Sequence, residues 1–173
     1  PSVFQNSRIV RYASVNQSGD VAATTSAVLT AGLFDIAGCA FQPGTGDFWV
    51  ANGQGAEGQP GASSIVRFLR GGTLASPSFG DINRQDFLPL RNFTLPFPSV
   101  NGLAFDKAGN LWAASNEGHE IRMFPNQGGG VISSTHAFSI MNPEIYRPYA
   151  VAVDDAGNLY VSDVQVNGGI PGS

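Results

Sequence analysis

One turn motif, which occurs twice in the second half of the chain, constrains the fold more than any other feature of the sequence. Residues 101–116 and residues 149–163 share an aspartate, a Gly-Asn pair, a leucine and an aromatic residue at identical spacing, and residues 37–52 form a looser copy. The corresponding residues are Asp106 and Asp154, Gly109 and Gly157, and Trp49, Trp112 and Tyr160. Each copy is an apolar run, a turn and a second apolar run, which predicts a β-hairpin.

A third strand is expected after each hairpin, and it gives the repeat its period. Ile9, Ile65 and Ile121 occupy the same place in three similar segments and are separated by two intervals of 56 residues. Weaker fourth strands are expected around residues 21–29, 86–93 and 135–140. Repeated units of four antiparallel strands predict a β-propeller. The alternative is a β-sandwich, which has no reason to repeat the same turn.

The phase of the repeat predicts a single all-β propeller domain of about three four-stranded antiparallel blades. Residues 1–36 are expected to supply the outer strands of a split blade, and residues 148–173 its inner strands. The segments 37–97 and 98–147 are expected to form complete blades. The two ends of the chain therefore have the length and the phase of two halves of one blade.

The composition supports one core and excludes several classes of partner. Hydrophobic residues make up 42% of the chain, which is enough for a core, whereas 22 glycines and 11 prolines are too many for a helix bundle. With Lys107 as its only lysine and a net charge of −4, the chain is not expected to bind nucleic acid, and it has no apolar stretch long enough for a membrane span. Cys39, the single cysteine, is expected to be a buried apolar residue.

The segments Leu103-Ala-Phe-Asp-Lys-Ala-Gly-Asn-Leu-Trp112 and Val151-Ala-Val-Asp-Asp-Ala-Gly-Asn-Leu-Tyr160 resemble repeats of the NHL type. They are equally similar to the related propellers of the gluconolactonase and streptogramin-lyase kind. The resemblance covers essentially the whole chain and implies a propeller of four-stranded blades. Because the motif is structural and is shared by propellers with many functions, it implies the fold more strongly than the activity.

Three blades are too few to close a ring, because known propellers have four or more. In one explanation, two chains form a six-bladed ring with two-fold symmetry, and each composite blade combines the inner strands of one chain with the outer strands of the other. In the other, the sequence is a piece of a longer propeller whose remaining blades lie outside it. The expected partners are thus another protein, further copies of the chain, or the remainder of a longer chain.

Binding residues are expected at one rim, where loops enter the innermost strand or follow the second strand. Asn52, Asn116 and Asp163 end the second strand of their units and His119 follows in a loop, so these four are candidates for rim binding. The alternative is that Asx side chains at strand ends hydrogen-bond backbone N–H groups. No nucleophile elbow, His-x-x-x-His pair or phosphate loop occurs in the sequence, so no catalytic residue is predicted.

Asn101 is a weak candidate for a metal ligand. Asn101-Gly-Leu-Ala is similar to the segment that supplies a metal-binding asparagine in gluconolactonase-like propellers. The equivalent residues Ala37 and Tyr149 offer no carboxylate, and calcium takes about six to eight oxygen ligands. We therefore expect no cofactor, with calcium near Asn101 as the alternative.

These features predict a propeller without catalytic activity that binds a protein or assembles with copies of itself. The alternative is a lactonase-like or lyase-like propeller enzyme with a divalent cation in the central channel. Low lysine content together with abundant Gly, Ser, Asn and Gln favours an extracellular or periplasmic location.

Overall fold

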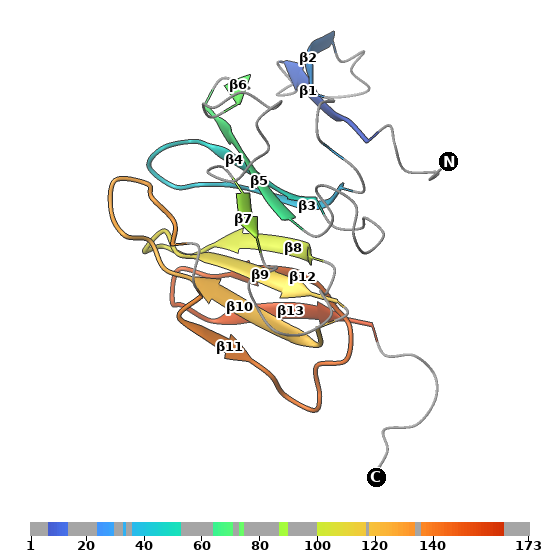
Figure 1. Ribbon diagram of the computed structural model, residues 1–173, viewed down its shortest axis with the longest axis vertical. Helices are drawn as coiled ribbons and strands as arrows, with labels where there is room; N and C mark the ends of the chain where they lie inside the picture. The colour runs from blue at the N-terminus through green and yellow to red at the C-terminus, as the bar shows by residue number, and fades with distance from the viewer. Residues whose placement is uncertain are drawn as a thin grey trace.

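The chain, described by a computed structural model, is built from antiparallel strands (Figure 1). The structure describes residues 7–13, 24–29, 33, 36–52, 64–70, 73–74, 87–89, 100–116, 118–133 and 136–164. These ranges contain strands, turns and bends and no helix, so the predicted all-β class is confirmed.

One four-stranded sheet lies in the second half of the chain. Its strands are β8 (Val100–Phe105), β9 (Leu111–Ser115), β10 (Glu120–Phe124) and β11 (Phe138–Ile140), and they lie side by side in that order. β8 and β9 form the hairpin that the turn motif predicts. β10 and β11 follow as the third and fourth strands, at the places where the sequence indicates them.

A second sheet is built in the same way. β3 (Ile36–Phe41), β4 (Phe48–Asn52) and β5 (Ser64–Leu69) lie side by side. Two short strands, β6 (Thr73–Leu74) and β7 (Phe87–Pro89), pair with opposite ends of the outer edge of β5. The outermost position of this sheet is therefore divided between two segments, whereas the sequence predicts one strand there.

Two further sheets contain two strands each. β1 (Ile9–Ala13) pairs with β2 (Thr24–Leu29), and β12 (Pro148–Val153) pairs with β13 (Leu159–Asp163). By their place in the repeat, β1 and β2 are outer strands, and β12 and β13 are inner strands. Figure 1 shows β1 and β2 at one end of the molecule, with β12 and β13 beside the β8–β11 sheet at the other end.

The turn between β8 and β9 explains why its sequence repeats. The Asp106 carboxylate accepts hydrogen bonds from the backbone N–H and the side-chain amide of Asn110, both at 2.9 Å, and from Trp112 Nε1 at 3.0 Å. Gly109 has a φ of 81°, which a side chain disfavours. The turn between β12 and β13 repeats each of these features with Asp154, Asn158, Tyr160 and Gly157.

In the described part of the chain, apolar side chains form layers between successive sheets. The central layer, between β3–β5 and β8–β10, contains Trp49, Ala51, Ile65, Val100, Leu103, Leu111, Ala113, Phe124 and Ile132. The layer before it joins Ile9 of β1 to Leu33, Val50, Val66 and Phe68. The layer after it joins Ala114 and Ile121 to Val151, Leu159 and Val161. The sheets thus pack face to face in sequence order, as the blades of a propeller do.

Ile9, Ile65 and Ile121 occupy equivalent environments. Each one pairs with an aliphatic residue of the strand outside it, namely Leu29, Leu88 and Ile140. Each one also packs into the layer that faces the next sheet along the chain. The period of the sequence is therefore a period of the structure.

Two glycines allow the backbones of neighbouring inner strands to approach closely. A Cβ on Gly38 of β3 would lie 2.2 Å from the backbone oxygen of Asn101, and a Cβ on Gly102 of β8 would lie 2.6 Å from that of Tyr149. β3 therefore meets β8 as β8 meets β12. Ala150 holds the equivalent position on β12.

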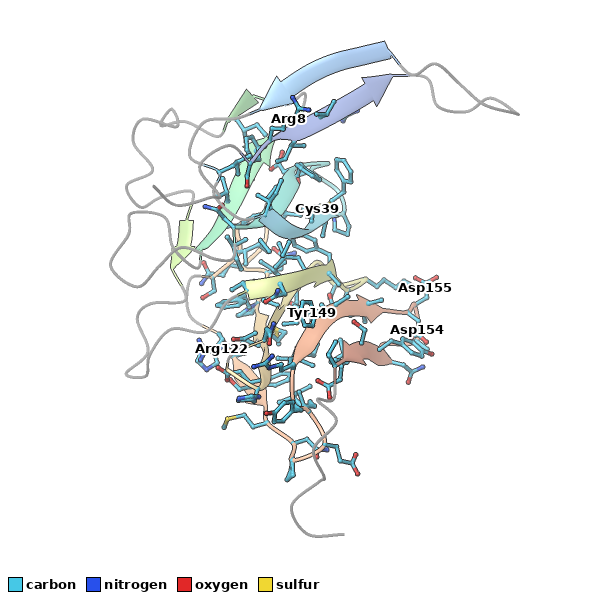
Figure 2. The ribbon with its side chains drawn as sticks, turned by 90° about the vertical axis from the view of Figure 1, so that its right-hand side faces the viewer. Arg8, Cys39, Arg122, Tyr149, Asp154 and Asp155 are labelled. Carbon is cyan, nitrogen blue, oxygen red and sulfur yellow. The ribbon has the colours of Figure 1, made fainter. Side chains whose placement is uncertain are left out.

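Cys39 is exposed, so the expectation of a buried cysteine is wrong. It lies on β3 (Figure 2), where the burial pattern alternates and leaves Ala37, Cys39 and Phe41 exposed. The equivalent residues Leu103 and Val151 are buried against the preceding sheet. The described residues that precede β3 supply only the outer pair β1 and β2, so the side of β3 that carries Cys39 is uncovered.

Candidate functional site

Each inner strand has a β-bulge near its first residues. The register of β8 shifts around Asn101, that of β12 around Tyr149, and that of β3 between Ile36 and Cys39. A bulge bends the strand and redirects a side chain, and bulges are frequent beside active sites. The bulges mark one rim of the molecule, and Asn101 lies there with its side chain buried.

The second strands end at the same rim. Their register with the inner strands makes Asn52, Ser115 and Asp163 equivalent, and Asn116 lies one residue beyond the end of β9. The expected correspondence of Asn52, Asn116 and Asp163 is therefore displaced by one residue at Asn116. Asn52 and Asn116 are buried, and Asn116 Oδ1 has no hydrogen-bond partner. The rim thus contains buried amide side chains, but the three predicted residues are not exact structural equivalents, because Asn116 lies one residue beyond the position that Asn52 and Asp163 share.

Asp163 and His119 converge on one peptide group. The Asp163 carboxylate accepts the N–H of Tyr146, at 3.0 and 3.1 Å, and the N–H of Arg147, at 2.6 Å. On the other side of the same residue, His119 Nδ1 contacts the Tyr146 carbonyl oxygen, and the two rings lie 5.2 Å apart. Both side chains therefore hold the loop between β11 and β12. This is the structural role expected of Asx residues at strand ends.

The turn carboxylates do not have the properties of a general acid. Burial raises the pKa of Asp106, but hydrogen bonds from Trp112 and Asn110 outweigh it and bring the pKa below its ordinary value of 3.8. Hydrogen bonds from Asn158 lower the pKa of Asp154 in the same way. A catalytic acid requires a raised pKa. Both groups stay ionised near neutral pH and act as turn acceptors.

We expect Asp106→Asn to lower the free energy of unfolding at pH 7 by about 1 kcal/mol, because a carboxylate that accepts several hydrogen bonds is replaced by a neutral amide. A group whose folded pKa is depressed contributes stability above its unfolded pKa, and this stability is lost as the pH falls through the folded pKa. In Asp106→Asn, urea titrations from pH 7 to pH 2.5 should therefore show a smaller loss of stability below pH 3.8 than in the wild type. Asp154→Asn removes the equivalent carboxylate from the more exposed turn and should show the same effect to a smaller extent.

A buried ion pair lies on β10. Arg122 donates to the carboxylate of Glu120, and both side chains are more than nine-tenths buried. They share a face with Phe124, which belongs to the central layer. His136 contacts the Phe124 ring, and burial together with the positive charge of Arg122 lowers its pKa. The alternation of Glu120, Arg122 and Phe124 indicates a shared face, but the burial of the ion pair is visible only in the structure.

Gln42 was not singled out by the sequence analysis, although it takes the place of the turn aspartate in the first hairpin. It is buried, its Oε1 accepts Trp49 Nε1 at 3.0 Å, and its Nε2 donates to the carbonyl of Gly130 at 2.9 Å. Alignment of Gln42 with Asp106 could have indicated the bond to Trp49. The bond to Gly130 joins two sheets and has no local sequence signal.

The described residues near Asn101 do not fit a calcium site. Calcium takes about six to eight oxygen ligands, usually including several carboxylates. The bulge positions supply one amide and no carboxylate, and the carboxylate of Asp163 accepts two backbone N–H groups. Within the described ranges, no group of three or more His, Cys, Asp or Glu side chains is placed to hold a metal ion.

Comparison with known proteins identifies the fold of the chain but does not assign the chain to a family. No family model and no curated protein matches the chain. Among solved structures, a luciferin-regenerating enzyme matches with a TM-score of 0.51 and 18% identity, covering 82% of this chain and 42% of that one. A glucose dehydrogenase matches with a TM-score of 0.45 and 16% identity, covering 74% of this chain and 36% of that one. This chain spans less than half of the length of either protein.

The stacked antiparallel sheets, together with the similarity to the luciferin-regenerating enzyme, define a fold of the β-propeller type, as the repeat predicts. At a sequence identity of 18%, this similarity is evidence for the fold and not for any activity. In the described part of the chain, no helix has the length and apolar character needed to cross a membrane.

Proposed function

We propose that the protein is a non-catalytic, NHL-like propeller module that acts outside the cytoplasm and binds a protein partner or further copies of itself. Its binding surfaces are the open face of the half-built blade β12–β13 at one end and, at the other, the side of β3 that carries Cys39. At the rim, Asp163 and His119 hold the loop between β11 and β12, and Asn52, Asn101 and Asn116 are buried amides.

The observation that supports this proposal is the exposure of one repeated aromatic position. Trp49 of β4 is 3% exposed and Trp112 of β9 is partly buried, because a sheet covers each of them. Tyr160 of β13 holds the same position and is 58% exposed. Phe41, on the open side of β3, is 69% exposed. Large apolar side chains at positions built for burial mark a surface that a partner covers.

The described polar groups at the rim and in the hairpin turns at the opposite end of the strands support binding and not catalysis. Asp163 and His119 are engaged with the Tyr146 peptide, and Asp106 and Asp154 are turn acceptors with lowered pKa values. Buried amides such as that of Asn116 can orient a polar group, but they do not transfer protons at neutral pH.

The alternative function is that of a lactonase-like or lyase-like enzyme that uses a divalent cation near Asn101. The bulge at Asn101 favours it, since β-bulges are frequent beside active sites. It requires further oxygen ligands from outside the described residues.

The deciding experiment measures hydrolysis of D-glucono-δ-lactone by the purified protein with Ca²⁺, Mn²⁺ or Zn²⁺ and with EDTA. We expect the rate of the buffer alone in every case, and the same melting temperature with Ca²⁺ and with EDTA. A rate that EDTA abolishes and that Asn101→Ala removes would establish the enzyme and end the non-catalytic proposal. Asn126→Ala, which changes an asparagine in a loop away from the rim, is the control.

A further inference from the structure

Within the part of the chain that the structure describes, the outer edge of β13 has no partner at a place where the other hairpins are paired. β4 pairs with β5, and β9 pairs with β10. In the described ranges β13 pairs only with β12, and β1, which corresponds to β5 and β10, pairs only with β2. Among the described strands, therefore, none takes the third place beside β13 or the second place beside β1. An unpaired edge is a template for strand addition.

We propose that β1 of a second copy pairs with β13, so that two copies complete each other's split blade and close a two-fold ring. This inference rests on the proposed function, because it names the partner of the same open faces. One chain cannot make the pair with itself, because β1 and β13 lie at opposite ends of the molecule with two sheets between them (Figure 1). The assembly has two seams, at each of which β13 of one copy meets β1 of the other. A two-fold axis makes these two seams identical, and the assembly is closed.

The two existing pairings fix the register. Ala51 lies opposite Ile65, and Ala114 lies opposite Ile121. Ser162 holds the position of these alanines, so it is expected to lie opposite Ile9 of the second copy. The remaining pairs in this register are Asp163 with Arg8, Val161 with Val10, Tyr160 with Arg11 and Leu159 with Tyr12.

The charges agree with this register. Arg8 is exposed at the start of β1 (Figure 2), and Asp163 ends β13. An ionised carboxylate has about four acceptor positions, so Asp163 can accept from a guanidinium in addition to its two backbone N–H groups. Opposite charges at facing positions of an antiparallel pair stabilise it, whereas like charges oppose it.

The open faces are complementary as well. In the central layer, Trp49 packs edge-to-face on Phe105, with ring centroids 6.0 Å apart. Tyr160 corresponds to Trp49, and Phe41 corresponds to Phe105. The assembly therefore places Tyr160 of one copy against Phe41 of the other, and it buries Cys39 as the preceding sheet buries Leu103.

Ala150 sets a limit on the seam. Gly38 and Gly102 allow adjacent inner strands to touch, and a Cβ at either position would lie less than 3 Å from backbone atoms of the next strand. Ala150 has this Cβ. The inner strands β12 and β3 are therefore expected to lie farther apart at the two seams between copies than neighbouring inner strands do within one copy. The two copies are then held together mainly by the pairing of β13 with β1.

The first test is register-specific cross-linking in a Cys39→Ser background. Val10→Cys and Val161→Cys are expected to form an intermolecular disulfide on mild oxidation when the two single variants are mixed, because facing residues of an antiparallel pair have Cβ atoms about 5 Å apart. Val10→Cys mixed with Ser162→Cys is the matched control. A one-residue slip puts the two thiols on opposite faces of the sheet, so this mixture should not cross-link.

The second test uses Cys39 as a probe in the otherwise unaltered chain. Reaction of its thiol with a chromogenic disulfide reagent should be slow at high protein concentration and fast on dilution. In Tyr160→Asp, the Cys39 thiol should react fast even at high protein concentration. Self-association should be weaker by at least about tenfold, the effect expected for loss of a buried aromatic anchor. Met141→Asp, at a 74% exposed position in the loop between β11 and β12, should leave both measurements unchanged.

The outcomes separate the two proposals. A multimer whose mass is a multiple of 18.1 kDa, but without the Val10–Val161 cross-link, overturns the proposed pairing and leaves the assembly function intact. A monomer at all concentrations, with Cys39 always reactive, overturns the second copy as partner. Cation-dependent lactone hydrolysis overturns the proposed function itself, whatever the mass.

Discussion

Gly102→Ala is expected to lower the free energy of unfolding by about 3 kcal/mol, the upper part of the range for overpacking a core. The added Cβ would lie 2.6 Å from the backbone oxygen of Tyr149 and 2.7 Å from the Cα of Ala150. Neither is the end of a flexible side chain, so β8 and β12 must move apart along their length. Chemical unfolding in urea, followed by tryptophan fluorescence, measures the change.

Gly38→Ala should have a similar effect, because its Cβ would lie 2.2 Å from the backbone oxygen of Asn101. Two controls separate crowding from the general cost of replacing glycine. Gly157→Ala has no atom within 4 Å of the new Cβ and tests the cost of positive φ alone, about 1 kcal/mol. Ala150→Gly makes the reverse change at the equivalent place on β12. If Gly102→Ala costs no more than Gly157→Ala, the close approach of the inner strands is not a property of the protein.

The sequence predicted the parts of the fold that depend on local turns and on their repetition. The carboxylate of Asp106 holds its turn through Asn110 and Trp112, and each partner lies within six residues. A feature of this kind is visible as a motif. The equivalence of Ile9, Ile65 and Ile121 was predictable for the same reason, since identical local segments adopt the same place in successive sheets.

Features that depend on a neighbouring sheet could not be predicted. Cys39 has the sequence surroundings of a buried strand residue, and its exposure depends on which strands precede β3. The link from Gln42 to Gly130 spans 88 residues. Such contacts come from packing between sheets, for which one sequence holds no local signal.

Ile65→Ala is expected to cost about 4 kcal/mol, within the range for truncating a fully buried isoleucine. Ile65 is fully buried in the central layer, and its loss leaves a cavity between two complete sheets, which the paired strands cannot collapse to fill. Ile121→Ala, fully buried in the next layer, should cost a similar amount. Ile65→Val is the conservative control, expected at about 1 kcal/mol.

Ile9→Ala extends this series to the split blade. Ile9 is only partly buried against Val50, Val66 and Phe68, so in an isolated chain its truncation should cost about 1 kcal/mol, well below the range for a full cavity. Pairing of β1 with β13 of a second copy would cover the remaining surface of Ile9. The cost of Ile9→Ala should then rise with protein concentration toward that of Ile65→Ala, because a partner that binds only the folded state adds to its stability. A cost that stays the same from micromolar to millimolar protein would show that Ile9 remains at an open edge, whereas the cost of Ile65→Ala relative to Ile65→Val should not depend on concentration.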